Sequence, residues 1–131
     1  MNKMFNSSIF FDNFNLHLAD YIDILMNERK LAFNTVYNYD QYLTNYGLFL
    51  SGKVKSLEEI KPRYLIQWFA DMLISKKVKP QTILVRMSMT RKFHEYLENK
   101  GIVGFNPSNG IRLVKVDDNG SSIHKIEVNH G

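Results

Sequence analysis

The chain of 131 residues contains no cysteine. This absence excludes disulfide frameworks, thiolate zinc sites and thiol nucleophiles, and it is compatible with a reducing environment, so we predict a cytoplasmic protein. Long apolar runs are also missing, because no stretch approaches the roughly 18–20 residues that a membrane span needs. The N-terminal segment lacks the layout of a signal peptide. Hydrophobic residues at 44% and aromatic residues at 13% are the values of a single globular domain with its own core.

The residues of common catalytic and metal sites are present only in scattered form. His17, His94, His124 and His130 never pair at a ligand spacing such as His-x-x-x-His. On its helix His94 falls on the inner side, so we predict a packing residue. Neither a phosphate-binding glycine loop nor a Gly-x-Ser-x-Gly turn occurs. We therefore expect no active site, no metal and no cofactor.

Positive charge is concentrated in one part of the chain. From Lys76 to Lys100 there are seven Lys or Arg against two acids, a net +5, whereas the whole chain carries +4. Such a helix is usually a solvated face, but the charge makes nucleic acid the first candidate partner. An acidic protein is the alternative. A membrane surface is not expected, because the basic helix also carries core residues and would have to unpack to lie on lipid.

Apolar residues at three- and four-residue steps predict four helices, over about residues 12–27, 35–50, 64–76 and 80–101. Asn34 is the predicted N-cap of the second helix, while Pro80 opens the fourth and Gly101 ends it. Gly47 lies within an apolar stripe and indicates a close approach by a neighbouring helix. The predicted inward residues are Phe14, Leu18, Tyr21, Ile22 and Leu25; Val36, Tyr39, Leu43, Tyr46 and Leu50; Leu65, Trp68, Phe69, Met72 and Leu73; and Ile83, Met87, Thr90, Phe93 and Leu97.

These patterns divide the chain into a flexible N-terminus (residues 1–11), a helical domain (12–113) and a linker or tail (114–131). The last segment alternates apolar and polar residues around Asp-Asp-Asn-Gly, which is typical of a hairpin. An isolated two-stranded hairpin is only marginally stable in water, so a flexible linker is the favoured interpretation.

Two motifs carry a family resemblance. The first is Asn34-Thr35-Val36-x-x-Tyr39-x-x-x-Leu43-x-x-Tyr46-x-x-Phe49-Leu50. The second is Thr82-Ile83-x-x-Arg86-Met87-Ser88-x-x-Arg91-x-Phe93-x-x-Tyr96-Leu97, followed by Gly101-Ile102 and Asn106-Pro107. Together they resemble the N-terminal core-binding domain of tyrosine recombinases, the lambda-integrase and Xer-like family, over about residues 12–113.

The resemblance implies an all-α, four-helix, SAM-like orthogonal bundle with a flexible or hairpin-like C-terminal tail. It implies half of a clamp around double-stranded DNA, acting in DNA integration and site-specific recombination, with the second and fourth helices in the major groove. Self-association on DNA through neighbouring core-binding domains is also allowed. The implied DNA-binding residues are Asn34, Thr35, Asn38, Gln41, Lys79, Gln81, Thr82, Val85, Arg86, Met89 and Lys92. In this arrangement Lys and Arg would neutralise phosphates, whereas Gln, Asn or Arg could contact the edges of bases. Val85 or Met89 could contact the methyl group of a thymine.

The catalytic half of that family has no counterpart in the sequence. Recombinases of this type need a second domain with a catalytic Arg, Lys, His-x-x-Arg and a tyrosine nucleophile. The residues three positions after His17, His94 and His124 are Asp20, Leu97 and Glu127, never Arg. We interpret the seven tyrosines as core or groove residues, so we expect no strand cleavage by this chain. The chain would be either an excised domain or a naturally truncated relative of these recombinases. The sequence thus predicts a DNA-binding module, with a helical protein-interaction module for an acidic partner as the alternative.

Overall fold

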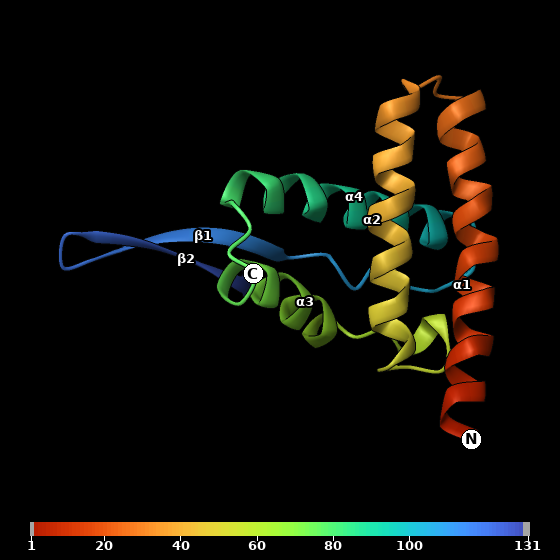
Figure 1. The fold of residues 1–131 in the computed structure, drawn as a ribbon, viewed down its shortest axis with the longest axis horizontal. Coiled ribbons are helices and arrows are strands. Elements are labelled where there is room, and N and C mark those ends of the chain that lie inside the picture. The colour runs from red at the N-terminus through yellow and green to blue at the C-terminus, as the bar shows by residue number, and fades with distance from the viewer. Residues whose placement is uncertain (1, 130–131) are drawn as a thin grey trace.

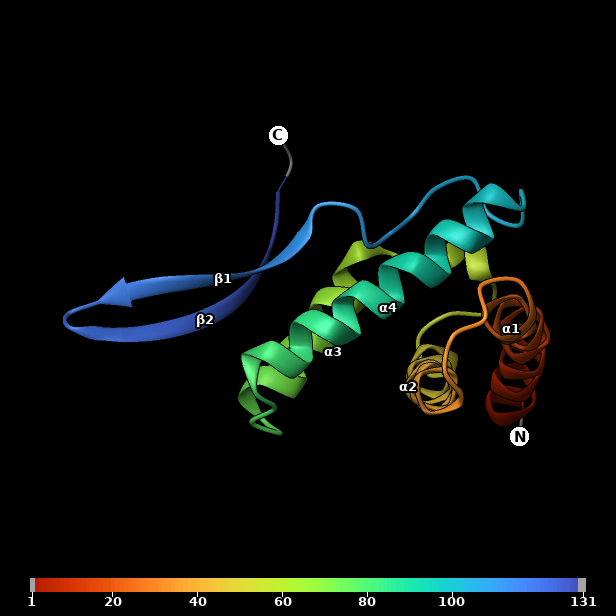
Figure 2. The ribbon, with the colours of Figure 1, turned by 90° about the horizontal axis from the view of Figure 1, so that it is seen from above.

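The computed structural model describes residues 2–129, apart from the side chains of residues 2–8 and 118. The elements in order are α1 (Asn2–Asn27), α2 (Phe33–Ser51), the 3-10 turn η1 (Leu57–Glu59), α3 (Pro62–Ile74), α4 (Pro80–Asn99), β1 (Ile111–Asp118) and β2 (Ser121–Val128). Helices α1 and α2 lie side by side, and α3 and α4 form a second pair that crosses the first (Figure 1; Figure 2). The predicted helical bundle is confirmed, with a β-hairpin added to it.

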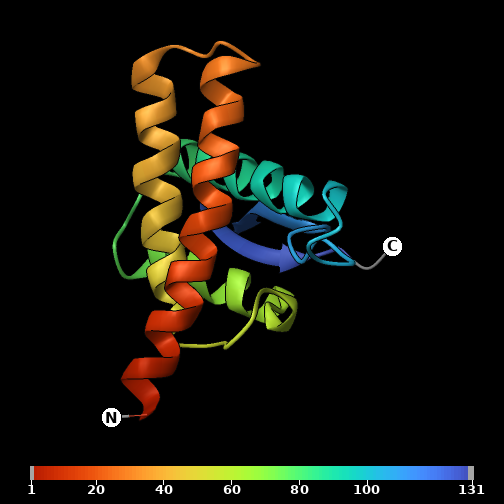
Figure 3. The same ribbon diagram turned by 90° about the vertical axis from the view of Figure 1, so that its right-hand side faces the viewer.

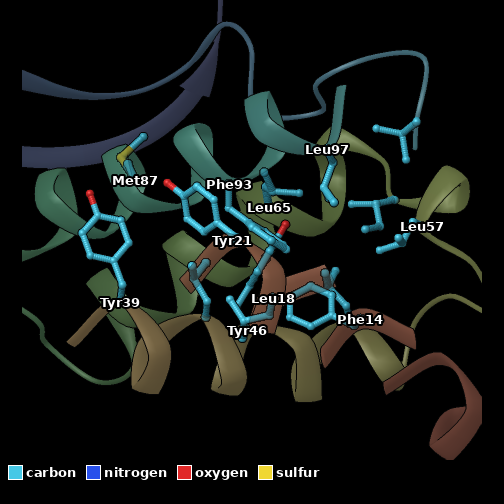
Figure 4. Close-up of a cluster of buried hydrophobic side chains, with 14 of the residues drawn as sticks. Phe14, Leu18, Tyr21, Tyr39, Tyr46, Leu57, Leu65, Met87, Phe93 and Leu97 are labelled. Atoms are coloured by element: carbon cyan, nitrogen blue, oxygen red, sulfur yellow. The ribbon is translucent and has the colours of Figure 1, made fainter. Parts of the chain in front are cut away.

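Aromatic rings from three helices meet at the centre of the bundle (Figure 4). Phe14 of α1 lies 5.3 Å from Phe93 of α4 and 6.2 Å from Tyr46 of α2, measured between ring centroids. Tyr21 of α1 adds a fourth ring, 5.4 Å from Phe93. All of the residues predicted to face inward on α2 and α4 are buried. Burial of these large apolar side chains is the main source of stability of the fold.

Gly47 allows α2 to approach α1 closely. A Cβ atom at this position would lie 2.5 Å from Cδ1 of Phe14, a separation that real Cβ atoms do not show. The predicted close approach is therefore confirmed, and the two helices run together along the bundle (Figure 3).

Helix α1 begins at Asn2, whereas the sequence pattern placed its start near Asp12. Phe10 extends the buried stripe by one turn: it is 1% exposed, and its ring centroid is 6.0 Å from that of Phe14. Residues four apart lie on the same face of a helix, so burial of Phe10 favours continuation of the helix toward the N-terminus. Helix α1 thus runs across the boundary suggested at residue 12.

The predicted N-cap at Asn34 is wrong. Ala32 is the N-cap of α2, with no side-chain cap hydrogen bond, and Asn34 lies inside the first turn. The Ala32 carbonyl accepts from the Val36 N–H at 3.1 Å. Leu31 and Val36 occupy the two positions of a hydrophobic staple, and both pack into the core. Apolar packing, rather than side-chain capping, therefore sets the start of this helix.

Helix α4 begins and ends as predicted. Lys79 is its N-cap, and Pro80 occupies the first helical position. At the other end Gly101 has φ +73°, its N–H donates to the Glu98 carbonyl, and the Ile102 N–H donates to the Leu97 carbonyl, both at 3.0 Å. These two bonds form a Schellman motif, which a glycine closes without steric cost.

The C-terminal segment is an antiparallel hairpin, so the favoured linker interpretation is wrong and the hairpin alternative is confirmed. Asn119 and Gly120 both have positive φ, as a type I′ turn requires. The base of the hairpin is not isolated, because Ile111, Leu113 and Ile126 pack against the core. The distal part projects away from the helices (Figure 1; Figure 2). Packing at the base supplies the stability that the two strands lack by themselves.

Candidate nucleic-acid interface

An open cleft of about 620 Å³ lies between α2, α3 and α4. It is lined by Asn38, Gln41, Tyr42, Asn45, Leu48, Trp68, Met72, Lys76, Thr82, Val85, Arg86 and Met89. On α2 the three amides and Leu48 lie on the opposite side of the helix from the buried Leu43, and Tyr42 lies between the two sides. The apolar stripe that fixes α2 in the core therefore also turns its amide-bearing side to the cleft.

The lining of this cleft contains two cations, Lys76 and Arg86, and no Asp or Glu. Its neutral polar members are three side-chain amides and the hydroxyls of Thr82 and Tyr42. Amides and guanidinium groups both donate hydrogen bonds, and amides also accept them, which suits the edges of bases and the oxygens of phosphates. The cleft is thus equipped for a polar, anionic ligand.

A chain of hydrogen bonds starts from the lining residues Trp68 and Tyr42 and joins three helices. Trp68 Nε1 donates to the Tyr42 hydroxyl at 3.0 Å, and that oxygen is 2.7 Å from Thr90 Oγ1. Thr90 is buried and donates its own proton to the Arg86 carbonyl at 2.8 Å. Each hydroxyl has one proton, so Tyr42 must donate to Thr90, and every bond in the chain has a defined direction.

Burial keeps the Tyr42 hydroxyl protonated. It raises the pKa of Tyr42 to about 12, against smaller lowering effects from its hydrogen bonds to Thr90 and Trp68 and from the charge of Arg86. The hydroxyl therefore remains a donor throughout the physiological pH range, and the chain from Trp68 to Arg86 keeps its direction.

A second buried pair lies beside this chain. His94 is 1% exposed, and its Nε2 atom is 2.7 Å from the hydroxyl of Tyr46. Desolvation lowers the pKa of His94 to about 3, so the ring is neutral at physiological pH, and burial raises the pKa of Tyr46 well above its ordinary value. The prediction that His94 is a packing residue is confirmed.

Charge is distributed unequally over the bundle. Arg86 lies 5.8 Å from the ring centroid of Tyr42, and no carboxylate of the described residues is within 4.0 Å of it. Lys76 pairs with Asp71 at 3.8 Å, but both side chains are about half exposed or more, so the pair neutralises little. From Ile9 to Asn27, in contrast, α1 carries three exposed Asp and no Lys or Arg. Helix α1 packs against α2, and none of its residues lines the cleft.

Residues 18–101 match the model of the phage integrase N-terminal SAM-like domain. The chain belongs to this family. No curated protein and no solved structure matches it. The matched segment contains the whole cleft, from Asn38 to Met89, and ends at the glycine that terminates α4, so the hairpin lies outside it.

The SAM-like domain brings six of the eleven predicted DNA-binding residues together. These six line the cleft: Asn38, Gln41, Thr82, Val85, Arg86 and Met89. Lys79 and Gln81 are exposed at the start of α4, and Asn34 and Thr35 are exposed in the first turn of α2. Lys92 lies in a separate hollow of about 320 Å³ that Arg29 also lines. Six predicted residues therefore line one cleft, four more lie at the starts of α2 and α4, and Lys92 lies in a different hollow.

Sequence reasoning missed half of the cleft lining. The additional residues are Tyr42, Asn45, Leu48, Trp68, Met72 and Lys76. Asn45 carried a usable signal, because it follows Asn38 and Gln41 at helical spacing. Trp68 and Met72 were predicted as core residues; Met72 is buried, whereas Trp68 is partly exposed to the cleft of the SAM-like domain.

The described residues hold neither a metal site nor a membrane-spanning helix. Among residues 2–129 no group of three or more His, Asp or Glu is placed to hold a metal ion. Among the described residues, no helix combines the length and the hydrophobicity that a membrane span requires.

Proposed function

We propose that this chain is the duplex DNA-binding module of a tyrosine recombinase, acting in DNA integration or site-specific recombination and leaving strand cleavage to a catalytic domain. The observation that carries the proposal is the cleft between α2 and α4, which is lined by amides and two cations and by no acid. The membership of the chain in the integrase SAM-like family makes DNA the natural ligand of that surface. The setting we propose is the cytoplasm.

The ends of the two helices support the same assignment. Neither α2 nor α4 has an acidic residue in its first turn, and neither has a side-chain cap hydrogen bond. Free N–H groups at a helix N-terminus attract anions, so each end suits a phosphate. Thr35 and Lys79 lie beside these ends, where a hydroxyl and an ammonium group could donate to the same phosphates.

The second candidate function is binding of an acidic protein. Leu48 and Val85 line the cleft while 51% and 52% exposed, and exposed apolar side chains are more typical of a protein partner than of a phosphate backbone. Apolar contacts do occur with thymine methyl groups in the major groove, so these residues are also compatible with duplex DNA.

Fluorescence anisotropy of a labelled random-sequence duplex, titrated at several salt concentrations, separates the two functions. Release of counterions from DNA gives a linear fall of log affinity with log salt, and non-specific binding should be roughly micromolar or weaker. Lys79→Ala should reduce the slope by about one and weaken binding to every sequence. Lys55→Ala removes an exposed lysine elsewhere and serves as the matched control.

Polyglutamate of similar length supplies the rival ligand. The DNA proposal predicts that it competes poorly with duplex at equal charge concentration. Equal competition, or a slope that Lys79→Ala leaves unchanged, would favour the protein-binding alternative.

A further inference from the structure

Arg86 is held in the cleft without being neutralised. Its guanidinium has five N–H donors, and its one side-chain hydrogen-bond partner among the described residues is the Met72 sulfur, at 3.5 Å from Nη1. No carboxylate of that part of the chain lies within 4.0 Å. The side chain is nevertheless half-buried rather than free in solvent. It therefore keeps most of its hydrogen-bonding capacity for a ligand.

Tyr42 contacts the side chain of Arg86 directly and is linked to its backbone through Thr90. The face of its ring supports the guanidinium at 5.8 Å, a cation–π distance. Its hydroxyl is bonded to Thr90, which in turn donates to the backbone carbonyl of Arg86. Because Trp68 fixes the same hydroxyl from α3, the ring has little freedom to rotate. The side chain and the backbone of Arg86 are thus set by one tyrosine on another helix.

We propose that Tyr42 is a positioning residue that presents Arg86 to a guanine in the major groove, so that the base opposite α4 is selected by a two-pronged contact to its O6 and N7 atoms. This inference rests on the proposed DNA-binding function and adds a base preference to it. A planar guanidinium with two parallel donors matches those two acceptors, and no other base presents the same pair.

The surroundings of Arg86 favour a base edge over a phosphate. A phosphate contact needs only a positively charged side chain that is long enough to extend to the DNA backbone, and exposed residues such as Lys79 provide this. Arg86 instead lies within the cleft, flanked on α4 by Thr82, Val85 and Met89, where side chains that enter a groove would meet base edges. Restriction by Tyr42 also reduces the conformational entropy lost when both prongs bind.

Selection from a randomised duplex pool, followed by sequencing, tests the preference. The wild-type protein should enrich guanine at one position. Replacing that guanine with 7-deazaguanine removes N7 but keeps base pairing, and it should weaken wild-type binding by roughly 5- to 150-fold. Arg86→Lys keeps the charge but replaces the planar fork with a single ammonium group, so it should discriminate less between the two duplexes. Arg63→Lys is the matched control, because Arg63 lies over Tyr64 at 5.0 Å outside the cleft.

Two further variants test Tyr42 itself. Tyr42→Phe removes the hydroxyl that Trp68 and Thr90 hold, so it should weaken the 7-deazaguanine effect, and Tyr42→Leu, which also removes the ring beside the guanidinium, should lose the effect. Tyr42→Leu that folds and still distinguishes the two duplexes would overturn the positioning role. If that variant does not melt cooperatively, Tyr42→Phe decides, because an undiminished 7-deazaguanine effect in it would overturn the positioning role of the hydroxyl.

The outcomes separate this inference from the proposed function. Absence of any salt-dependent duplex binding by the wild type contradicts both. Duplex binding without guanine enrichment, or without sensitivity to 7-deazaguanine, contradicts the assignment of Arg86 and leaves the DNA-binding function standing.

Discussion

Mild acid should destabilise the SAM-like domain through a single buried histidine. His94 is 1% exposed, and burial lowers its pKa from an unfolded value near 6.5 to about 3. Above pH 6.5 the ring is neutral in both states, so the contribution to stability is fully present. Below it the unfolded chain takes up a proton that the folded protein does not, and stability is lost as the pH falls toward 3.

The expected magnitude follows from the two pKa values. The free energy of unfolding should fall by about 1.4 kcal/mol for each pH unit well below 6.5, which amounts to about 2 kcal/mol between pH 7 and pH 5. Urea denaturation followed by circular dichroism at pH 7, 6 and 5 measures this change. His94→Gln does not titrate and can still hydrogen-bond the Tyr46 hydroxyl, so this share of the pH dependence should disappear. Parallel pH dependence in the two proteins would refute the reasoning.

Two further predictions concern packing. Gly47→Ala should cost about 1–3 kcal/mol of unfolding free energy in urea denaturation, because its Cβ would be 2.5 Å from the Phe14 ring; an unchanged midpoint would contradict the close contact. Leu97→Ala should cost about 2–5 kcal/mol, whereas Lys92→Ala on an exposed face should stay within about 0.5 kcal/mol, and thermal melts showing equal losses would contradict the orientation of α4.

The helices were predictable because each one buries a stripe with helical period. On α2 and α4 every residue predicted to face inward is buried, since packing of an amphipathic face decides both the helix and its orientation. The starts of α1 and α2 were not predictable in the same way. They depend on Phe10 and Leu31 reaching the core, and local capping signals such as Asn34 carry no information about that.

The hairpin shows the same limit. Its alternation and its Asn119-Gly120 turn were visible in the sequence, but its stability comes from Ile111, Leu113 and Ile126 packing on the bundle. Sequence alone cannot say that a marginal hairpin has a surface to pack on, so the linker interpretation was preferred and was wrong.

The candidate site was predictable in part. Six of the residues that the family resemblance implicated on α2 and α4 meet in one cleft. The hydrogen-bond chain beside the cleft could not be predicted, because Tyr42 and Thr90 are 48 residues apart and neither belongs to a recognisable polar motif. The contribution of α3, through Trp68 and Lys76, follows only from the way the second helix pair crosses the first.

The central claim is that duplex DNA occupies the cleft between α2 and α4, and Trp68 offers a direct test. It is the only tryptophan in the chain, and it lines the cleft with its indole N–H bonded to Tyr42. In a proton–nitrogen correlation spectrum, added duplex should shift the Trp68 indole signal and the side-chain amide signals of Asn38 and Gln41, while the backbone signals of exposed Asp20 and Asp23 on α1 stay in place. Shifts confined to α1 or to the hairpin, with an unmoved indole signal, would contradict the account.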